Sequence, residues 1–151
     1  QPERPLNQTL AEYLRPRRLL LVLDNCEHLV AACAKLVAAL LTAGPDVHIL
    51  ATSREILGVT GETTWSVPPL TVPLRSTRWQ GQGKILLQRS KRYEAFQLFV
   101  ERATSPLPTF SLTHQNAPFV AQVCQRLDGI PLAIELAATR VRLLTVKQIA
   151  G

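Results

Sequence analysis

Five consecutive apolar residues, Leu19 to Leu23, form the most distinct hydrophobic run of the chain. Because no polar residue alternates with them, they predict a strand buried on both faces, as in the middle of a parallel sheet. Asp24 and Asn25 end the run. Ligands of open α/β sheets bind at the carboxyl ends of strands, so Asp24 is a candidate ligand for Mg²⁺. The alternative is that Asp24 and Asn25 only cap the next helix.

From Cys26 to Leu41, apolar residues recur at helical spacing, which predicts one continuous helix. Residues 47–51 then predict a second strand, and Arg54 follows shortly after it. A strand, a helix and a strand make a crossover unit whose strands are parallel and adjacent. Asp24 and Arg54 are therefore expected at the same edge of one sheet.

Outside this crossover unit, the pattern predicts a third strand and several helices. Residues 63–67 are the candidate strand, and residues 9–14 a short helix before the first strand. Residues 70–92 show no clear periodicity and predict a loop with one short helix near residues 85–87. Further helices are expected at residues 93–103, 114–127 and 132–144, the last of them well buried, with Thr145 capping one more.

These elements divide the chain into three parts. Residues 1–72 are expected to form part of an α/β subdomain, residues 73–92 a basic linker or insertion, and residues 93–151 a helical subdomain.

The composition is that of a chain that can bury a core, with 151 residues and 46% hydrophobic content. No apolar run approaches the length needed to cross a membrane. No membrane partner is therefore expected, and three cysteines without framework spacing favour a reducing, cytoplasmic compartment.

The net charge of +6 is local to one segment. Six of the 17 basic residues lie between Arg75 and Arg92, where no acidic residue occurs; the rest of the chain carries 11 of each sign. Clustered cations bind phosphates and release counterions, so weak, non-specific nucleic-acid binding through residues 75–92 is one hypothesis. A solvated, mobile loop is the other.

Cys26, His28 and Cys33 do not predict a metal site. On a continuous helix, His28 lies about 200° round from Cys26, so the three side chains cannot meet on one ion. The same geometry argues against a Cys–His nucleophile pair. The pattern indicates core thiols and a surface imidazole.

Several motifs occur in an order that resembles a known family. The sequence LLLVLDNCEHL (19–29) is similar to a Walker B strand, ILATSRE (49–55) to a sensor-1 strand and WSVPPL (65–70) to the strand after it. Residues 94–103 and 124–138 are similar to a helical subdomain with a Gly-x-Pro motif. Together they resemble the STAND ATPases, P-loop NTPases of the NB-ARC-like branch, as in the ATPase domains of bacterial LuxR-type transcriptional regulators.

The resemblance implies an α/β fold, a partial P-loop NTPase parallel sheet followed by an all-α subdomain. It implies that Asp24 holds Mg²⁺, that Arg54 reads the γ-phosphate of ATP and that Pro131 packs near the adenine. The ATP or ADP state would then set the angle between the subdomains. Because Asn25 stands where many relatives have a second acidic residue, Glu27 is the substitute candidate for the catalytic base.

The sequence departs from the family in one large respect: no Gly-x-x-x-x-Gly-Lys-Ser/Thr motif occurs in it. In the family, the P-loop strand precedes Walker B and lies between the sensor-1 strand and the strand expected at residues 63–67. The resemblance thus implies a fragment, a truncated copy or a degenerate relative that is inactive alone. Its expected partners are a P-loop segment, effector or sensor domains and another copy of itself.

The function expected from these features is part of an ATP/ADP-dependent signalling switch that controls a transcriptional effector. One alternative is a non-catalytic interaction module, or a remnant, that keeps the fold without binding nucleotide. The other is a basic nucleic-acid-binding domain.

Overall fold

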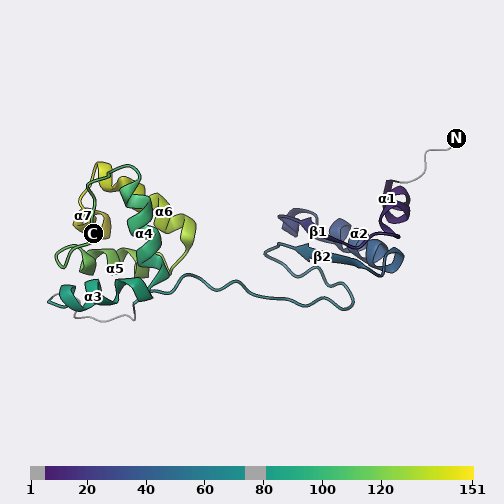
Figure 1. Ribbon diagram of the computed structural model, residues 1–151, viewed down its shortest axis with the longest axis horizontal. Coiled ribbons are helices and arrows are strands. Elements are labelled where there is room, and N and C mark those ends of the chain that lie inside the picture. Colours follow the sequence, from purple (N-terminus) through teal and green to yellow (C-terminus); the bar gives the residue numbers. More distant parts are fainter. Residues whose placement is uncertain (1–5, 74–80) are drawn as a thin grey trace. The chain divides into compact units, whose positions relative to one another are not determined.

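The computed structural model describes residues 6–73 and 81–151, which belong to two compact units, residues 1–66 and 67–151 (Figure 1). The boundary falls six residues before the expected end of the α/β part at residue 72. Arg75 and Arg78 of the expected basic linker lie outside the described residues.

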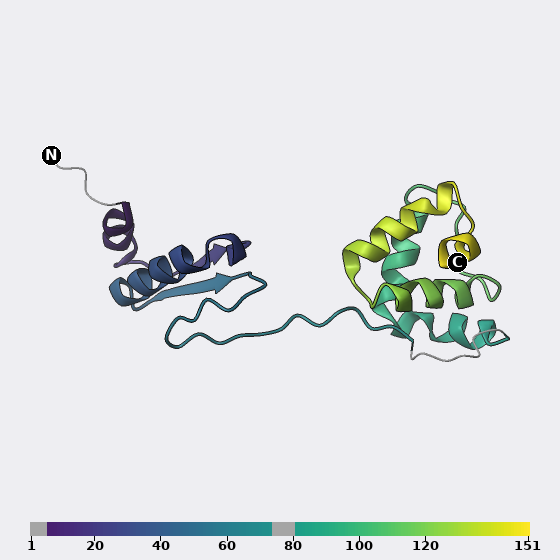
Figure 2. The ribbon, with the colours of Figure 1, turned by 180° about the vertical axis from the view of Figure 1, so that it is seen from behind.

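The first unit contains the predicted crossover. Its elements are α1 (Leu6–Leu14), β1 (Leu19–Leu23), the 3₁₀ turn η1 (Cys26–His28), α2 (Val30–Ala43) and β2 (Val47–Ala51). The strands pair in parallel, with Leu19 opposite Val47 and Leu23 opposite Ala51. Figures 1 and 2 show α2 running alongside both strands. The prediction of two adjacent parallel strands joined by a helix is confirmed.

The small sheet is covered on one face only. Leu14, Leu40 and Val47 form the core on the face that α1 and α2 cover. The side chains that alternate with the covered ones are exposed, Leu20 by 62%, Val22 by 54% and Leu50 by 54%. The prediction of burial on both faces is wrong, because no described element of this unit covers the second face.

The predicted continuous helix from Cys26 is interrupted. Leu29, with φ −139° and ψ 34°, separates η1 from α2. Asn25 adopts a left-handed conformation with φ 63°, and its side chain makes no capping hydrogen bond. The cause is a hydrogen bond to the residue that follows β2. The Cys26 N–H donates to the Thr52 carbonyl over 2.9 Å, and this bond fixes the turn that precedes α2.

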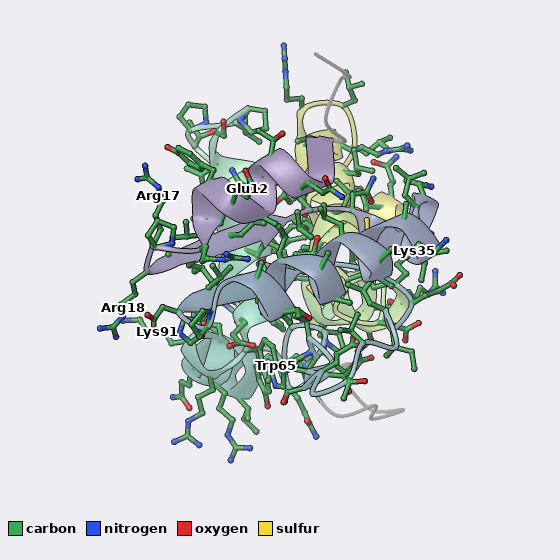
Figure 3. All side chains as sticks on the ribbon, turned by 90° about the vertical axis from the view of Figure 1, so that its right-hand side faces the viewer. Glu12, Arg17, Arg18, Lys35, Trp65 and Lys91 are labelled. Atoms are coloured by element: carbon green, nitrogen blue, oxygen red, sulfur yellow. The ribbon has the colours of Figure 1, made fainter. Side chains whose placement is uncertain are left out.

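The predicted strand at residues 63–67 is absent from the described structure. Trp65, labelled in Figure 3, is 79% exposed and Val67 is 75% exposed. A strand needs a hydrogen-bonded neighbour. No described strand pairs with residues 63–67. Pro68 and Pro69 next to the segment also lack N–H groups for a ladder.

The second unit is helical. Its elements are α3 (Gly83–Arg89), the 3₁₀ turn η2 (Ser90–Arg92), α4 (Glu94–Thr104), α5 (Ala117–Arg126), α6 (Pro131–Ala138), the 3₁₀ turn η3 (Thr139–Arg142) and α7 (Val146–Ala150). The core centres on side chains that are at most 2% exposed: Leu86, Phe96, Phe99, Val120 and Ile134. Thr145 and Gln148 form a capping box that begins α7, so the predicted cap is confirmed.

Two predictions for this unit need correction. Residues 83–92 form helical turns rather than mostly loop, because Leu86 inserts into the core. The helix expected over residues 132–144 changes to a 3₁₀ turn after Ala138, and it is half-exposed rather than well buried. Leu132 and Leu136, one turn apart, are 66% and 60% exposed, while Ile134 faces the core.

Candidate functional site at the strand ends

The carboxyl ends of β1 and β2 bring polar side chains into contact. We call Asp24, Asn25, Glu27, Thr52 and Arg54 the strand-end site. All five belong to the first unit. Since β1 and β2 are parallel and in register, the residues that follow them emerge at the same edge, as predicted for Asp24 and Arg54.

Thr52 joins the two strand ends. Its hydroxyl donates a hydrogen bond to Asp24 Oδ1. The same hydroxyl oxygen accepts the N–H of Asn25 over 2.9 Å. The left-handed conformation of Asn25 turns that N–H toward β2. Asp24 is therefore held by a neighbouring strand rather than free to cap a helix.

Glu27 and Arg54 form the second link across the edge. Arg54 Nε donates to Glu27 Oε1 over 2.9 Å; the Glu27 side chain is 11% exposed and that of Arg54 is 78% exposed. With the Asn25 amide oriented so that Nδ2 faces Glu27, that nitrogen lies 2.9 Å from Oε1 and 3.3 Å from Oε2. The Glu27 carboxylate thus lies next to a charged donor, the Arg54 guanidinium, and a neutral donor, the Asn25 amide.

These donors set the ionisation of Glu27. The hydrogen bond from its own backbone N–H lowers the pKa of Glu27, partial burial opposes that change, and Arg54 lowers the pKa further. A carboxylate with a lowered pKa is a weak proton acceptor at neutral pH. Its geometry suits a partner of Arg54 better than a catalytic base.

A hollow borders Arg54. It has a volume of about 370 Å³ and is lined by residues 51, 53–57 and 62–66, Trp65 among them. Glu62 closes the adjoining loop, because its carboxylate accepts the N–H groups of Leu57, Gly58 and Val59 over 3.2, 2.7 and 3.1 Å. Burial acts to raise the pKa of Glu62, but these backbone donors outweigh it and lower the pKa.

The site contains oxygen atoms of the kind that Mg²⁺ prefers as ligands. Mg²⁺ binds oxygen and usually uses one or two carboxylates besides waters and substrate phosphates. Asp24 supplies such a carboxylate and Thr52 a hydroxyl. Among the described residues, no three His, Cys, Asp or Glu side chains cluster to hold an ion by themselves. Phosphate oxygens would have to complete the coordination.

Pro131 belongs to the second unit. It begins α6 in the second unit, after the left-handed residues Asp128 and Gly129. The Gly129 carbonyl accepts the N–H of Leu70 over 3.0 Å, which fixes the turn before Pro131. The role of Pro131 near an adenine stays a prediction.

Thr52 is the site residue that sequence reasoning missed. Thr52 directly follows β2. Because the two strands are parallel and in register, this position lies beside Asp24, the residue that follows β1.

Four cations of the expected basic segment belong to the described residues. They are exposed on α3 and η2: Lys84, Arg89, Lys91 and Arg92. No helix of the described residues has both the length and the apolar character needed to cross a membrane.

Comparison with known proteins finds mycobacterial relatives. The chain is 45% identical over 150 residues to a putative HTH-type transcriptional regulator of Mycobacterium tuberculosis, and likewise to one of Mycobacterium bovis. The match covers 99% of this chain but 15% of those proteins. An uncharacterized protein of Mycobacterium tuberculosis is 40% identical over 152 residues, covering 100% of this chain and 34% of that protein. No family model and no solved structure matches the chain. The chain is thus similar to one segment of much longer proteins, some of which are named as transcriptional regulators.

Proposed function

We propose that this chain is part of a nucleotide-dependent switch that regulates transcription, of the STAND ATPase kind. The observation that carries the proposal is the hydrogen bond from Thr52 to Asp24 at the carboxyl ends of two parallel strands, next to Arg54. This is the edge at which open α/β sheets bind their ligands. The printed names of the relatives support a regulatory role.

In the proposed switch, Asp24 would hold Mg²⁺, and the hydrogen bond from the Thr52 hydroxyl to Oδ1 positions the Asp24 carboxylate. Arg54 contacts the terminal phosphate, since a guanidinium suits phosphate oxygens and most of this side chain is exposed. Glu27 holds Arg54 in place before a phosphate arrives. ATP or ADP binding would change the arrangement of the complete regulator and thereby its effector, which we propose to be a DNA-binding domain outside these residues.

The proposal is tested in a chimera in which a P-loop segment from the resembled family precedes residue 1. Calorimetric titration with ATP should show binding that strengthens when Mg²⁺ is added. Asp24→Ala should remove most of the strengthening by Mg²⁺. The matched control is Asp46→Ala, because Asp46 is an exposed carboxylate at the opposite, amino end of β2.

An interaction module is the second candidate, because the open sheet face exposes Leu20, Val22 and Leu50. The same titration separates the two candidates. If the chimera binds no nucleotide with or without Mg²⁺, the switch is refuted and the interaction module is favoured.

A further inference from the structure

The outer edge of β2, the edge that faces away from β1, carries main-chain groups without partners. The N–H of Thr52, the residue after β2, donates to the Leu23 carbonyl over 2.9 Å. With the strands in parallel register, the even-numbered residues of β2 therefore bond to β1. Ile49 and Ala51 direct their N–H and C=O groups to the outer edge. Among the described residues, no hydrogen bond uses these four groups.

A groove runs along this outer edge. It has a volume of about 360 Å³ and is lined by β2 on one side and by residues 57–63 on the other. The Glu62 carboxylate fixes the second side, because it accepts three backbone N–H groups of the same loop. The groove is therefore formed before anything enters it. An extended main chain is the partner whose donors and acceptors match those of a free strand edge.

β2 lacks the features that usually protect a free edge. Edge strands commonly carry charged side chains, proline or a bulge, which prevent pairing with another chain. Residues 47–51, VHILA, contain no Lys, Arg, Asp, Glu or Pro, and they pair with β1 without a break in register. Leu50 is 54% exposed on the open face of the sheet. The edge is thus open to a further strand with an apolar side chain beside Leu50.

The same chain contains a segment suited to this pairing. Residues 63–66, TTWS, are mostly of types favoured in strands, yet no described strand pairs with them. Trp65, labelled in Figure 3, is 79% exposed. In its own chain the segment continues from the loop that lines the groove, so it cannot enter the groove without displacing that loop. The segment of a second copy is free of this restriction.

We propose that two copies of this chain associate by strand exchange, in which residues 63–66 of each copy enter the groove of the other and pair with the outer edge of β2. Trp65 then packs beside Leu50 of the other copy. One four-residue pairing buries far less than the roughly 1,200–2,000 Å² of a stable interface, so the pairing is reciprocal and the dimer is weak. The contact uses neither nucleotide nor Mg²⁺ and does not depend on the proposed switch.

Sedimentation equilibrium of the 151-residue chain over a wide range of concentration tests the proposal. We expect a reversible equilibrium between monomer and dimer. Trp65→Ser should weaken dimerisation by about tenfold or more, because a reciprocal dimer loses the aromatic contact twice. Leu143→Ser is the matched control: Leu143 is an apolar residue that is 88% exposed in the second unit, and its loss should leave dimerisation unchanged.

Two further measurements examine the edge itself. Ala51→Pro removes an N–H from the outer edge while it keeps the hydrogen bonds to β1, and it should also weaken dimerisation by about tenfold or more. Where this variant does not fold, the comparison of Trp65→Ser with Leu143→Ser decides. Hydrogen exchange measured by NMR should show the Ile49 amide protected only at concentrations where the dimer forms. The Leu50 amide, which bonds to β1, should be protected in the monomer as well.

Three results would overturn the proposal. The first is a chain that stays monomeric at every concentration. The second is a dimer that Trp65→Ser does not weaken, or that Leu143→Ser weakens equally. The third is an Ile49 amide that exchanges freely in the dimer, or one that is already protected in the dilute monomer, which would mean that the chain covers its own edge.

Discussion

Arg54 Nε donates a hydrogen bond to Glu27 Oε1 over 2.9 Å and so joins the segment after β2 to the turn after β1. The Glu27 side chain is 11% exposed and that of Arg54 is 78% exposed. One end of the pair is therefore fixed in the fold while most of the guanidinium remains in contact with solvent. An arginine held in this way is ready to bind an anion without first being ordered.

The lowered pKa of Glu27, caused first by its own backbone N–H and then by Arg54, predicts a pH-dependent contribution to stability. The folded-state pKa of Glu27 is lowered from 4.5, so the unfolded chain binds the proton first as the pH falls. Its stabilising contribution is fully present above pH 4.5 and is lost as the pH drops through the folded-state pKa. Glu27→Gln should lower the free energy of unfolding at pH 7, and the difference from wild type should shrink below pH 4.5.

Urea unfolding followed at several pH values measures this difference. Glu55→Gln, a change of an exposed carboxylate in the same segment as Arg54, is the control and should produce a smaller effect at pH 7. An effect of Glu27→Gln that is constant from pH 7 to pH 3 would show that the ionised Glu27 carboxylate makes no contribution to stability.

Thr52→Val tests the link between the strand ends. The substitution keeps the shape but removes the hydrogen bond to Asp24 and the one from Asn25. Each hydrogen bond contributes roughly 0.5–1.5 kcal/mol, and exposure favours the lower end, so a loss of about 1 kcal/mol in unfolding free energy is expected. Thr60→Val, on an exposed threonine of the next loop, should change the unfolding free energy by less than about 0.5 kcal/mol.

A double-mutant cycle strengthens that test. Because Thr52 and Asp24 are in contact, Thr52→Val together with Asp24→Ala should cost less than the sum of the single changes. Additive losses would mean that the two side chains act independently.

Gly129→Ala tests the turn before Pro131 in the second unit. Gly129 has φ +70°, and a Cβ atom there would lie 2.2 Å from the Leu70 carbonyl oxygen. Strain and clash together should reduce the unfolding free energy by more than about 2 kcal/mol. Gly81→Ala is the matched control, since Gly81 has φ +92° with nothing within 4 Å, and should cost only about 1 kcal/mol. Equal losses in the far-UV circular dichroism transition would refute the close approach to Leu70.

The sequence pattern predicts those elements that depend on residues close together in the chain. β1 and β2 were predicted because an apolar run and a crossover length leave few alternatives, and the Thr145 cap because its partner lies three residues away. The break at Leu29 was not predictable from periodicity, since its cause is a hydrogen bond from Cys26 to Thr52, far along the chain. The open sheet face depends on which elements are present to cover it, and a hydrophobic run does not encode that.

For the candidate site, too, the sequence predicts the positions of residues but not their side-chain contacts. Asp24 and Arg54 were assigned to one edge from parallel topology alone. The partners that fix them, Thr52 and Glu27, depend on side-chain geometry across two strands. The position of Glu27 in the sequence makes it a candidate base, but that position does not reveal its contact with Arg54.

The 151-residue chain by itself should bind ATP–Mg²⁺ weakly and should not hydrolyse it. Most phosphate contacts in such sites come from P-loop N–H groups and the P-loop lysine, and the sequence has no P-loop motif. What Asp24 and Arg54 supply is worth less than about 4 kcal/mol, which corresponds to a dissociation constant of about 1 mM or weaker. Calorimetric titration measures this constant, and micromolar affinity would contradict the account.

The most direct test of the central claim is the nucleotide preference of Arg54→Ala in the chimera that carries a P-loop segment. If Arg54 contacts the terminal phosphate, the variant should lose about tenfold or more in ATP affinity, the effect of a charge-assisted hydrogen bond worth about 1.5–3 kcal/mol. Its ADP affinity should remain within about twofold of the parent chimera, since ADP lacks that phosphate. Equal loss for ATP and ADP, or no loss for either, would contradict the assignment of a nucleotide site to the ends of β1 and β2.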